Sequence, residues 1–324
     1  MQIMSLITAL PGAAAQGLIW GIMAIGVYIT FRILDIADLT VDGTLCTGGA
    51  VCIMMMLSGH NVWVSMLVAT GAGLLAGLAT GIFHTFMGIP AILAGILTQL
   101  SLYSINLKIM GKANQAINVD KFNLLVSLRR VKGVALTQNT LFIVAIMIII
   151  LIAVLYWFFG TELGCSLRAT GCNPSMSRAQ GINTDRNKVL GLMLSNGLVA
   201  LSGALLTQYQ GFADINMGRG SIVIGLAAVI IGEAIFSRIF RNFALKLLSV
   251  VFGSILYYLV LQIVIWMGID TDLLKMLSAL VVAFFLAFPY WKGKYFTKAK
   301  RRRRFAAARP HLHRGSDTGY RAAR

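Results

Sequence analysis

The sequence predicts an all-α polytopic membrane protein, and composition and hydropathy carry the prediction. Hydrophobic residues make up 58% of the 324 residues and charged residues only 12%, whereas soluble domains carry about 25% charged residues. Mean hydropathy is +0.80, and charge-free apolar stretches of the length that crosses a bilayer recur along the chain. These observations exclude an ordinary soluble enzyme, a disordered chain and a small secreted scaffold.

About nine apolar segments are candidate transmembrane helices. The segment 220–232 is too short alone, so it extends through Glu233 or belongs to a broken helix. The doubled Gly-x-x-x-Gly pattern at Gly73, Gly77 and Gly81 predicts a helix that packs closely against a neighbour. The candidate segments are 8–31, 43–59, 62–83, 88–107, 140–161, 189–210, 220–232, 242–267 and 273–291.

The chain divides into a transmembrane domain, residues 1–291, and a basic tail, residues 292–324. The tail holds twelve Lys/Arg and one acidic residue, a net charge of +11. A run such as Arg301–Arg304 can indicate nucleic-acid binding. Because this run follows an apolar segment, we interpret the tail as a disordered cytoplasmic anchor beside anionic lipid, with no nucleic-acid partner.

The distribution of Lys and Arg predicts the orientation in the membrane. Segments 162–188 and 237–246 are basic, and counting spans places both on the side of the C-terminal tail, with the N-terminus outside. The same count places the basic loop 108–132 outside, against the charge rule. Either the 140–161 span is misread or the loop needs its charge there, and the strongly apolar 140–161 span favours the second explanation.

Three carboxylates lie between the first two apolar spans, at Asp35, Asp38 and Asp42. Acidic residues near or within a membrane usually face a polar path or a partner, although Asp42 is also a suitable N-cap for an ordinary helix. The segment 42–50 aligns with 219–227 through shared glycines, hydroxyls and an alanine. By our orientation the two enter from opposite sides, which suggests the inverted repeat of many transporters.

The basic segment 162–188 has the pattern of a short helix on the cytoplasmic side. Asn173 is a suitable N-cap and Pro174 a suitable first residue, and Gly181 or Asn183 can close the helix. The segment is therefore either a plain surface loop or a docking element for a cytoplasmic partner.

Catalytic and metal-binding signatures are missing from the sequence. It contains no H-E-x-x-H, G-x-S-x-G or P-loop motif, and its four cysteines have no metal-ligand spacing. We therefore expect no catalytic residue, no metal and no cofactor in this chain. Uphill transport would take its energy from a partner or from an ion gradient.

Several motifs resemble those of a known family. They are Leu39–Thr44, Leu167–Asn173, Ala179–Ile182 and Leu201–Leu205. Together they are similar to the permease subunits of ABC importers of the branched-chain amino acid and ribose type, over about residues 12 to 290. Asp42-Gly43 and the stretch 103–111 resemble a little-characterised branch, in which some members are linked to aromatic amino acids.

The resemblance implies an assembly in the plasma membrane, with a cytoplasmic C-terminus. A permease homodimer would join two ATPase subunits, which bind ATP and magnesium, and receive a small polar solute from an extracytoplasmic binding protein. Residues 168–183 would be the coupling helix seated in the ATPase. The implied coupling residues are Arg168, Ala169, Gly171, Asn173, Pro174, Arg178 and Gly181.

The implied translocation path passes Asp42, Thr44 and Ser221, and polar side chains within apolar spans are further candidates to line it. Gln99, Asn196, Gln208 and Tyr209 are such side chains, although hydrogen bonding between helices explains them equally well. In the external loop, Arg129 and Arg130 are the predicted contacts for the binding protein.

Two other function classes are compatible with the sequence. The first is an ion-coupled secondary transporter with Asp38, Asp42 or Glu233 as the coupling carboxylate. The second is a membrane-embedded enzyme or flippase that handles lipid, against which the missing catalytic signatures argue.

Overall fold

A computed structural model describes most of the chain. The described residues are 2–118, 122, 124–131, 139–236, 242–267, 273, 276, 279–284 and 287. The tail 292–324 lies outside the described residues, as do most of the predicted last span 273–291 and the basic residues Arg238 and Arg241.

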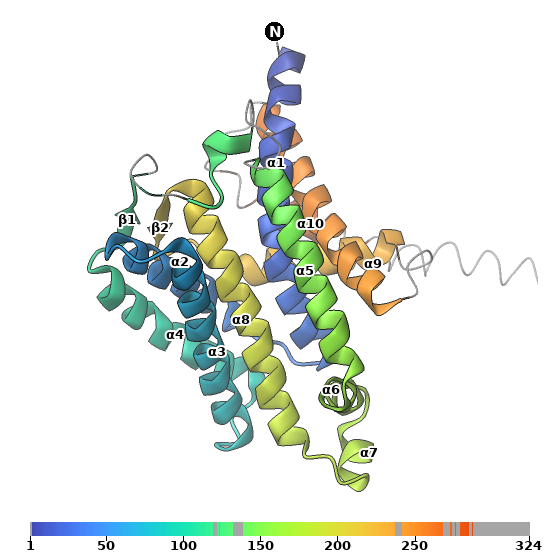
Figure 1. Ribbon diagram of the computed structural model, residues 1–324. Helices are drawn as coiled ribbons and strands as arrows, with labels where there is room; N and C mark the ends of the chain where they lie inside the picture. The colour runs from blue at the N-terminus through green and yellow to red at the C-terminus, as the bar shows by residue number, and fades with distance from the viewer. Residues whose placement is uncertain are drawn as a thin grey trace, which may run out of the picture.

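The described residues form a helical bundle, which confirms the predicted fold class (Figure 1). Six helical segments are long and apolar enough to cross a membrane, and α2 and α9 are shorter apolar helices. The short apolar segment 220–232 lies in α9, which extends through Glu233 to Phe236, as the first of the two alternatives for this segment expected. The principal helices are α1 (Gln2–Tyr28, continued by the π-helical turn η1, Ile29–Ile33), α2 (Val41–Leu57), α3 (Val62–Thr85), α4 (Ala91–Met110), α5 (Thr140–Gly160), α8 (Thr184–Gln210), α9 (Ser221–Phe236) and α10 (Phe243–Trp266).

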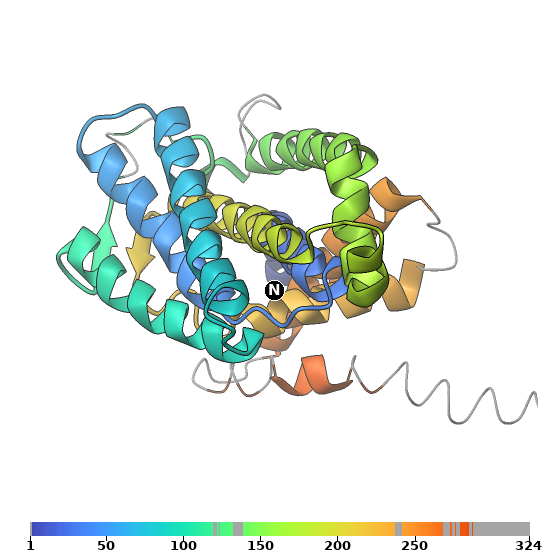
Figure 2. The same ribbon diagram turned by 90° about the horizontal axis from the view of Figure 1, so that it is seen from below.

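The helices α1 and α8 form the centre of the bundle. In the most apolar window of each, more than 70% of the residues are buried, against fewer than 30% in α4 and α5. Figure 2 views the molecule from below and shows α1 surrounded by other helices. The peripheral α4 and α5 therefore present apolar surface outward, as membrane helices do toward lipid or another subunit.

The predicted glycine seam on α3 is confirmed, and its partner is α8. A Cβ atom on Gly73 would collide with the backbone carbonyl of Asn196, and one on Gly77 with the carbonyl of Leu192. Gly81 lies against Val189 in the same row. Small residues are required here because the two backbones approach each other directly.

The two ends of the bundle carry different connections. One end holds the N-terminus, the 3-10 turn η2 (Leu128–Val131) and a two-stranded ribbon of β1 (Asn114–Ala116) and β2 (Phe212–Asp214); the other holds α6 (Glu162–Cys172) and α7 (Pro174–Ala179) (Figure 1). This separation agrees with the predicted placement of 108–132 opposite 162–188. The sequence did not predict the antiparallel ribbon, since three-residue strands leave no periodic pattern.

Candidate functional site

The short helices α2 and α9 begin next to each other, and the side chain of Asp42 links their first turns. The carboxylate of Asp42, in the first turn of α2, accepts hydrogen bonds from the backbone N–H of Gly220 (2.9 Å) and Ile222 (3.0 Å) and from the hydroxyl of Ser221 (2.8 Å). The first N–H groups of a helix have no partner within the helix, and its N-terminus favours negative charge. Asp42 therefore caps α9 from another helix.

A second aspartate, Asp38, organises the start of α2. Its side chain is buried and accepts hydrogen bonds from the backbone N–H of Thr40 (2.9 Å) and the side-chain amide of Asn196 on α8 (2.7 Å). The amide oxygen of Asn196 in turn accepts a hydrogen bond from the hydroxyl of Thr44 (2.7 Å). No salt bridge to Asp38 is found among the described residues, so amide and backbone donors stabilise this carboxylate.

Three buried threonine hydroxyls extend this polar network across the bundle. The Thr40 and Thr80 hydroxyls are 2.8 Å apart, and Thr80 donates a hydrogen bond to Thr98 at 2.9 Å. Thr80 lies on α3 and Thr98 on α4. The start of α2 is therefore linked by side-chain hydrogen bonds to α3, α4 and α8.

A cavity of about 350 Å³ opens beside Asp42, and it contains both signs of charge. The side chain of Asn106 is 1% exposed, and its oxygen has no hydrogen-bond partner among the described residues. A buried acceptor without a donor is costly, so a bound molecule that donates a hydrogen bond suits this position. The cavity is lined by Asp42, Gly43, Cys46, Gln99, Leu100, Tyr103, Asn106, Ile215 and Arg219.

Of the predicted path residues, Asp42 and Gln99 line this cavity. Thr44 and Ser221 are buried and do not line it, although each bonds to a residue of the same region. Tyr103, Asn106 and Arg219 also line the cavity and were not predicted as path residues. Tyr103 and Asn106 lie in the family motif 103–111, and the alignment of Arg219 with Asp42 was the available signal.

The other polar residues within apolar spans connect elements of the bundle. Asn196 bonds to Asp38, the Tyr209 hydroxyl donates to the Gly12 carbonyl (3.0 Å), and the Gln208 oxygen accepts from the Leu125 N–H (3.2 Å). These contacts agree with the helix-to-helix interpretation rather than with lining a path.

At the other end of the bundle, the predicted coupling segment forms two helices rather than one. Asn173 ends α6 and caps α7, because its side-chain oxygen accepts a hydrogen bond from the Met176 N–H (3.0 Å). The single helix over 168–183 that the resemblance implied is therefore wrong, whereas the short helix predicted to begin at Asn173-Pro174 is confirmed. Asn173 is extended (φ −157°), as the residue before a proline tends to be. Pro174 is the first residue of α7, and Gly181 follows the helix with φ +81°.

The predicted coupling residues occupy different environments. Gly171 packs against η1 so closely that a Cβ would collide with the Ile33 carbonyl. Arg178 donates hydrogen bonds to the Thr184 hydroxyl (2.7 Å) and the Asp185 carboxylate (3.2 Å), while Ala169 is exposed. All α7 residues except Ser177 are exposed, and the side chain of Met176 projects with 63% exposure.

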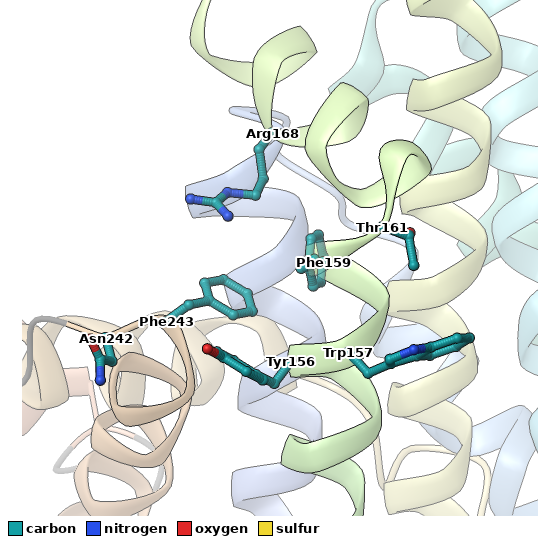
Figure 3. Close-up of a pocket in the computed structure, with 8 residues that line it drawn as sticks. Tyr156, Trp157, Phe159, Thr161, Arg168, Asn242 and Phe243 are labelled. Carbon is teal, nitrogen blue, oxygen red and sulfur yellow. The ribbon is translucent and has the colours of Figure 1, made fainter.

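Arg168 lies apart from α7, at a pocket between α5, α6 and α10 (Figure 3). Its guanidinium carbon is 5.5 Å from the centre of the Phe243 ring, a cation–π contact.

The two arginines of the loop that is predicted to be external also differ. Arg130 is half-buried and donates a hydrogen bond to the Leu124 carbonyl (2.9 Å), whereas Arg129 is exposed.

The three carboxylates considered for ion coupling all have partners. Asp38 and Asp42 are bonded as described, and Glu233 accepts a hydrogen bond from Arg32 at 3.0 Å. No group of three or more His, Cys, Asp or Glu residues with a metal-binding arrangement occurs in the described part of the chain.

These features define the class of protein: a polytopic helical membrane protein whose short helices meet at a polar cavity. The chain belongs to the family described as "Branched-chain amino acid transport system / permease component", which it matches over residues 10–286. The family resemblance drawn from the sequence motifs is therefore confirmed.

Curated relatives span most of the chain. It is 39% identical to a tyrosine transport system permease protein of Clostridioides difficile, over 84% of this chain and 88% of the relative. It is 38% identical to an uncharacterized protein of Rickettsia prowazekii, over 86% of this chain and 95% of the relative. A fructose import permease protein of Bifidobacterium longum is 25% identical, over 76% of this chain and 67% of the relative. No solved structure matches the chain significantly.

Proposed function

We propose that this chain is the permease subunit of an ABC importer that takes up an amino acid, with an aromatic side chain as the preferred class. ATP hydrolysis takes place in partner subunits, and alternating access of the helical bundle moves the solute. The cavity at the start of α2 and α9 is the observation that carries the proposal.

The chemistry of the cavity supports an amino acid as the solute. Asp42 and Arg219 line it with opposite charges, as a molecule with an ammonium and a carboxylate requires. The unpartnered oxygen of Asn106 suits an N–H donor, and Tyr103 offers an aromatic surface. A relative named for tyrosine transport supports the same substrate class.

The outer face of α4 supports a homodimer. Leu100 and Tyr103 line the cavity and are 64% and 42% exposed. A polar cavity that opened to lipid would be costly, so a second copy of the chain that covers this face completes the cavity.

The other partners follow from the two ends of the bundle. The projecting α7, with exposed Met176, is the proposed contact for the ATPase on the cytoplasmic side. At the opposite end, Arg129 is the proposed contact for an extracytoplasmic binding protein, because it is exposed. The basic tail 292–324 is proposed to stay cytoplasmic, and the chain itself is proposed to hold no cofactor.

Co-purification after mild extraction tests this proposal. We expect the native chain to recover an ATPase subunit, identified by its P-loop sequence, and Met176→Asp to lose it, because a carboxylate replaces the projecting apolar side chain. Arg129→Glu, at the other end, is the matched control and keeps the ATPase. Failure of the native chain to recover an ATPase would favour the ion-coupled carrier, against which family membership now argues.

A further inference from the structure

A second pocket shares no lining residue with the Asp42 cavity and lies between α5, α6 and α10. Its volume is about 560 Å³, in the range of small-molecule sites. Figure 3 shows Arg168 of α6, Phe243 of α10 and Tyr156 of α5 turned toward the same space. The pocket is lined by Tyr156, Trp157, Phe159, Gly160, Thr161, Arg168, Asn242 and Phe243.

The position of this pocket along α5 places it at a membrane–water boundary. The helix has 21 residues, a length of about 30 Å, which matches the hydrocarbon core of a bilayer. Tyr156 and Trp157 lie near its C-terminal end and are 56% and 70% exposed. Tyr and Trp are enriched at such interfaces because their rings are apolar and their polar atoms reach water.

The lining of the pocket includes one charged side chain, Arg168, and no acidic residue. The Arg168 guanidinium forms no hydrogen bond or salt bridge with another described residue, and it lies over the Phe243 ring. Asn242 makes no side-chain bond to the helix that it caps. Glu162 follows the lining residue Thr161 in the chain, but it is exposed and does not itself line the pocket.

We propose that this pocket binds the phosphate headgroup of an anionic phospholipid, with phosphatidylglycerol as the representative ligand. The planar guanidinium of Arg168 suits two phosphate oxygens, and the Asn242 amide suits a headgroup hydroxyl. The acyl chains lie along the exposed apolar face of α5. By the proposed orientation the site faces the cytoplasmic leaflet, and basic pockets between helices on that side commonly bind anionic headgroups.

Lipid binding to the purified permease tests the site without any ATPase or transport activity. Native mass spectrometry in mild detergent, with equal phosphatidylglycerol and phosphatidylcholine, measures the preference for the first bound lipid. We expect the native chain to prefer phosphatidylglycerol about fivefold, the factor that one basic residue contributes near an anionic surface. Arg168→Gln is expected to abolish the preference, and Arg168→Lys to retain part of it.

Arg186→Gln is the matched control, because Arg186 is also exposed near this end of the bundle, at the start of α8, and does not line the pocket. Equal preference in the native chain and in Arg168→Gln would overturn the proposal. So would displacement of the lipid by millimolar glycerol phosphate, which would indicate a site for soluble anions. If Arg168→Gln loses ATPase co-purification and keeps the lipid preference, Arg168 belongs to the ATPase contact and the lipid proposal is wrong. Failure of the importer proposal would leave the lipid measurement unaffected.

Discussion

The starts of α2 and α9 are both organised by an aspartate from the same short segment, but in opposite ways. Asp38 fixes the start of α2 from a buried position, through Thr40 and the α8 residue Asn196. Asp42 fixes the start of α9 from the edge of a cavity, where Arg219 also lies. The comparison indicates that the first carboxylate holds the bundle together, whereas the second joins two helices at the place where the solute is proposed to pass.

The largest expected effect follows removal of the buried carboxylate. Asp38→Ala leaves the Thr40 N–H and the Asn196 amide without their acceptor, so we expect a loss of about 3 kcal/mol of stability. Thermal unfolding in detergent measures it, and Asp38→Asn, which keeps one acceptor oxygen, is expected to lose less. A change within error for Asp38→Ala would show that the buried network is not what orders α2.

A smaller loss of stability is expected when the carboxylate at the edge of the cavity is removed. Asp42→Ala removes the acceptor for the N–H groups at the start of α9. Because water in the cavity can replace part of these hydrogen bonds, we expect a loss of about 2 kcal/mol of stability. The same unfolding assay measures it. A loss larger than that of Asp38→Ala would reverse the comparison between the two aspartates.

The threonine chain tests how far the buried network extends. Thr80→Val keeps the shape of the side chain and removes the hydroxyl between Thr40 and Thr98, so we expect a loss of about 1 kcal/mol. Thr70→Val is the control, because its hydroxyl bonds within its own helix, to the Met66 carbonyl. Equal losses in the two variants would argue against a link across the helices.

The smallest effect on stability is expected at Arg219, with a large effect on transport. The side chain is exposed at the cavity, so Arg219→Gln is expected to change stability by less than about 0.5 kcal/mol. Uptake of L-tyrosine is expected to fall at least tenfold, since the proposed contact to the solute carboxylate is lost. Normal uptake by a stable Arg219→Gln variant would remove this residue from the path.

Much of the fold could be predicted from the sequence, because long charge-free segments and the glycine seam depend on local composition. The Asn173-Pro174 start of α7 was also predicted, since capping depends on neighbouring residues. The roles of Asp38 and Asp42 were not, because these depend on contacts between residues far apart in the chain. Asp42 and Gly220, for example, meet across 178 positions. The cavity residues Tyr103 and Asn106 gave no separate signal, since they resemble any polar residue in a membrane helix.

The most direct test of the central claim is uptake by proteoliposomes that contain the permease with its co-purified ATPase. L-Tyrosine is supplied with the binding protein on one side and ATP is enclosed on the other. We predict uptake that requires ATP and persists when ionophores collapse all ion gradients. Uptake that proceeds without ATP and stops with the ionophores would contradict the account and support an ion-coupled carrier.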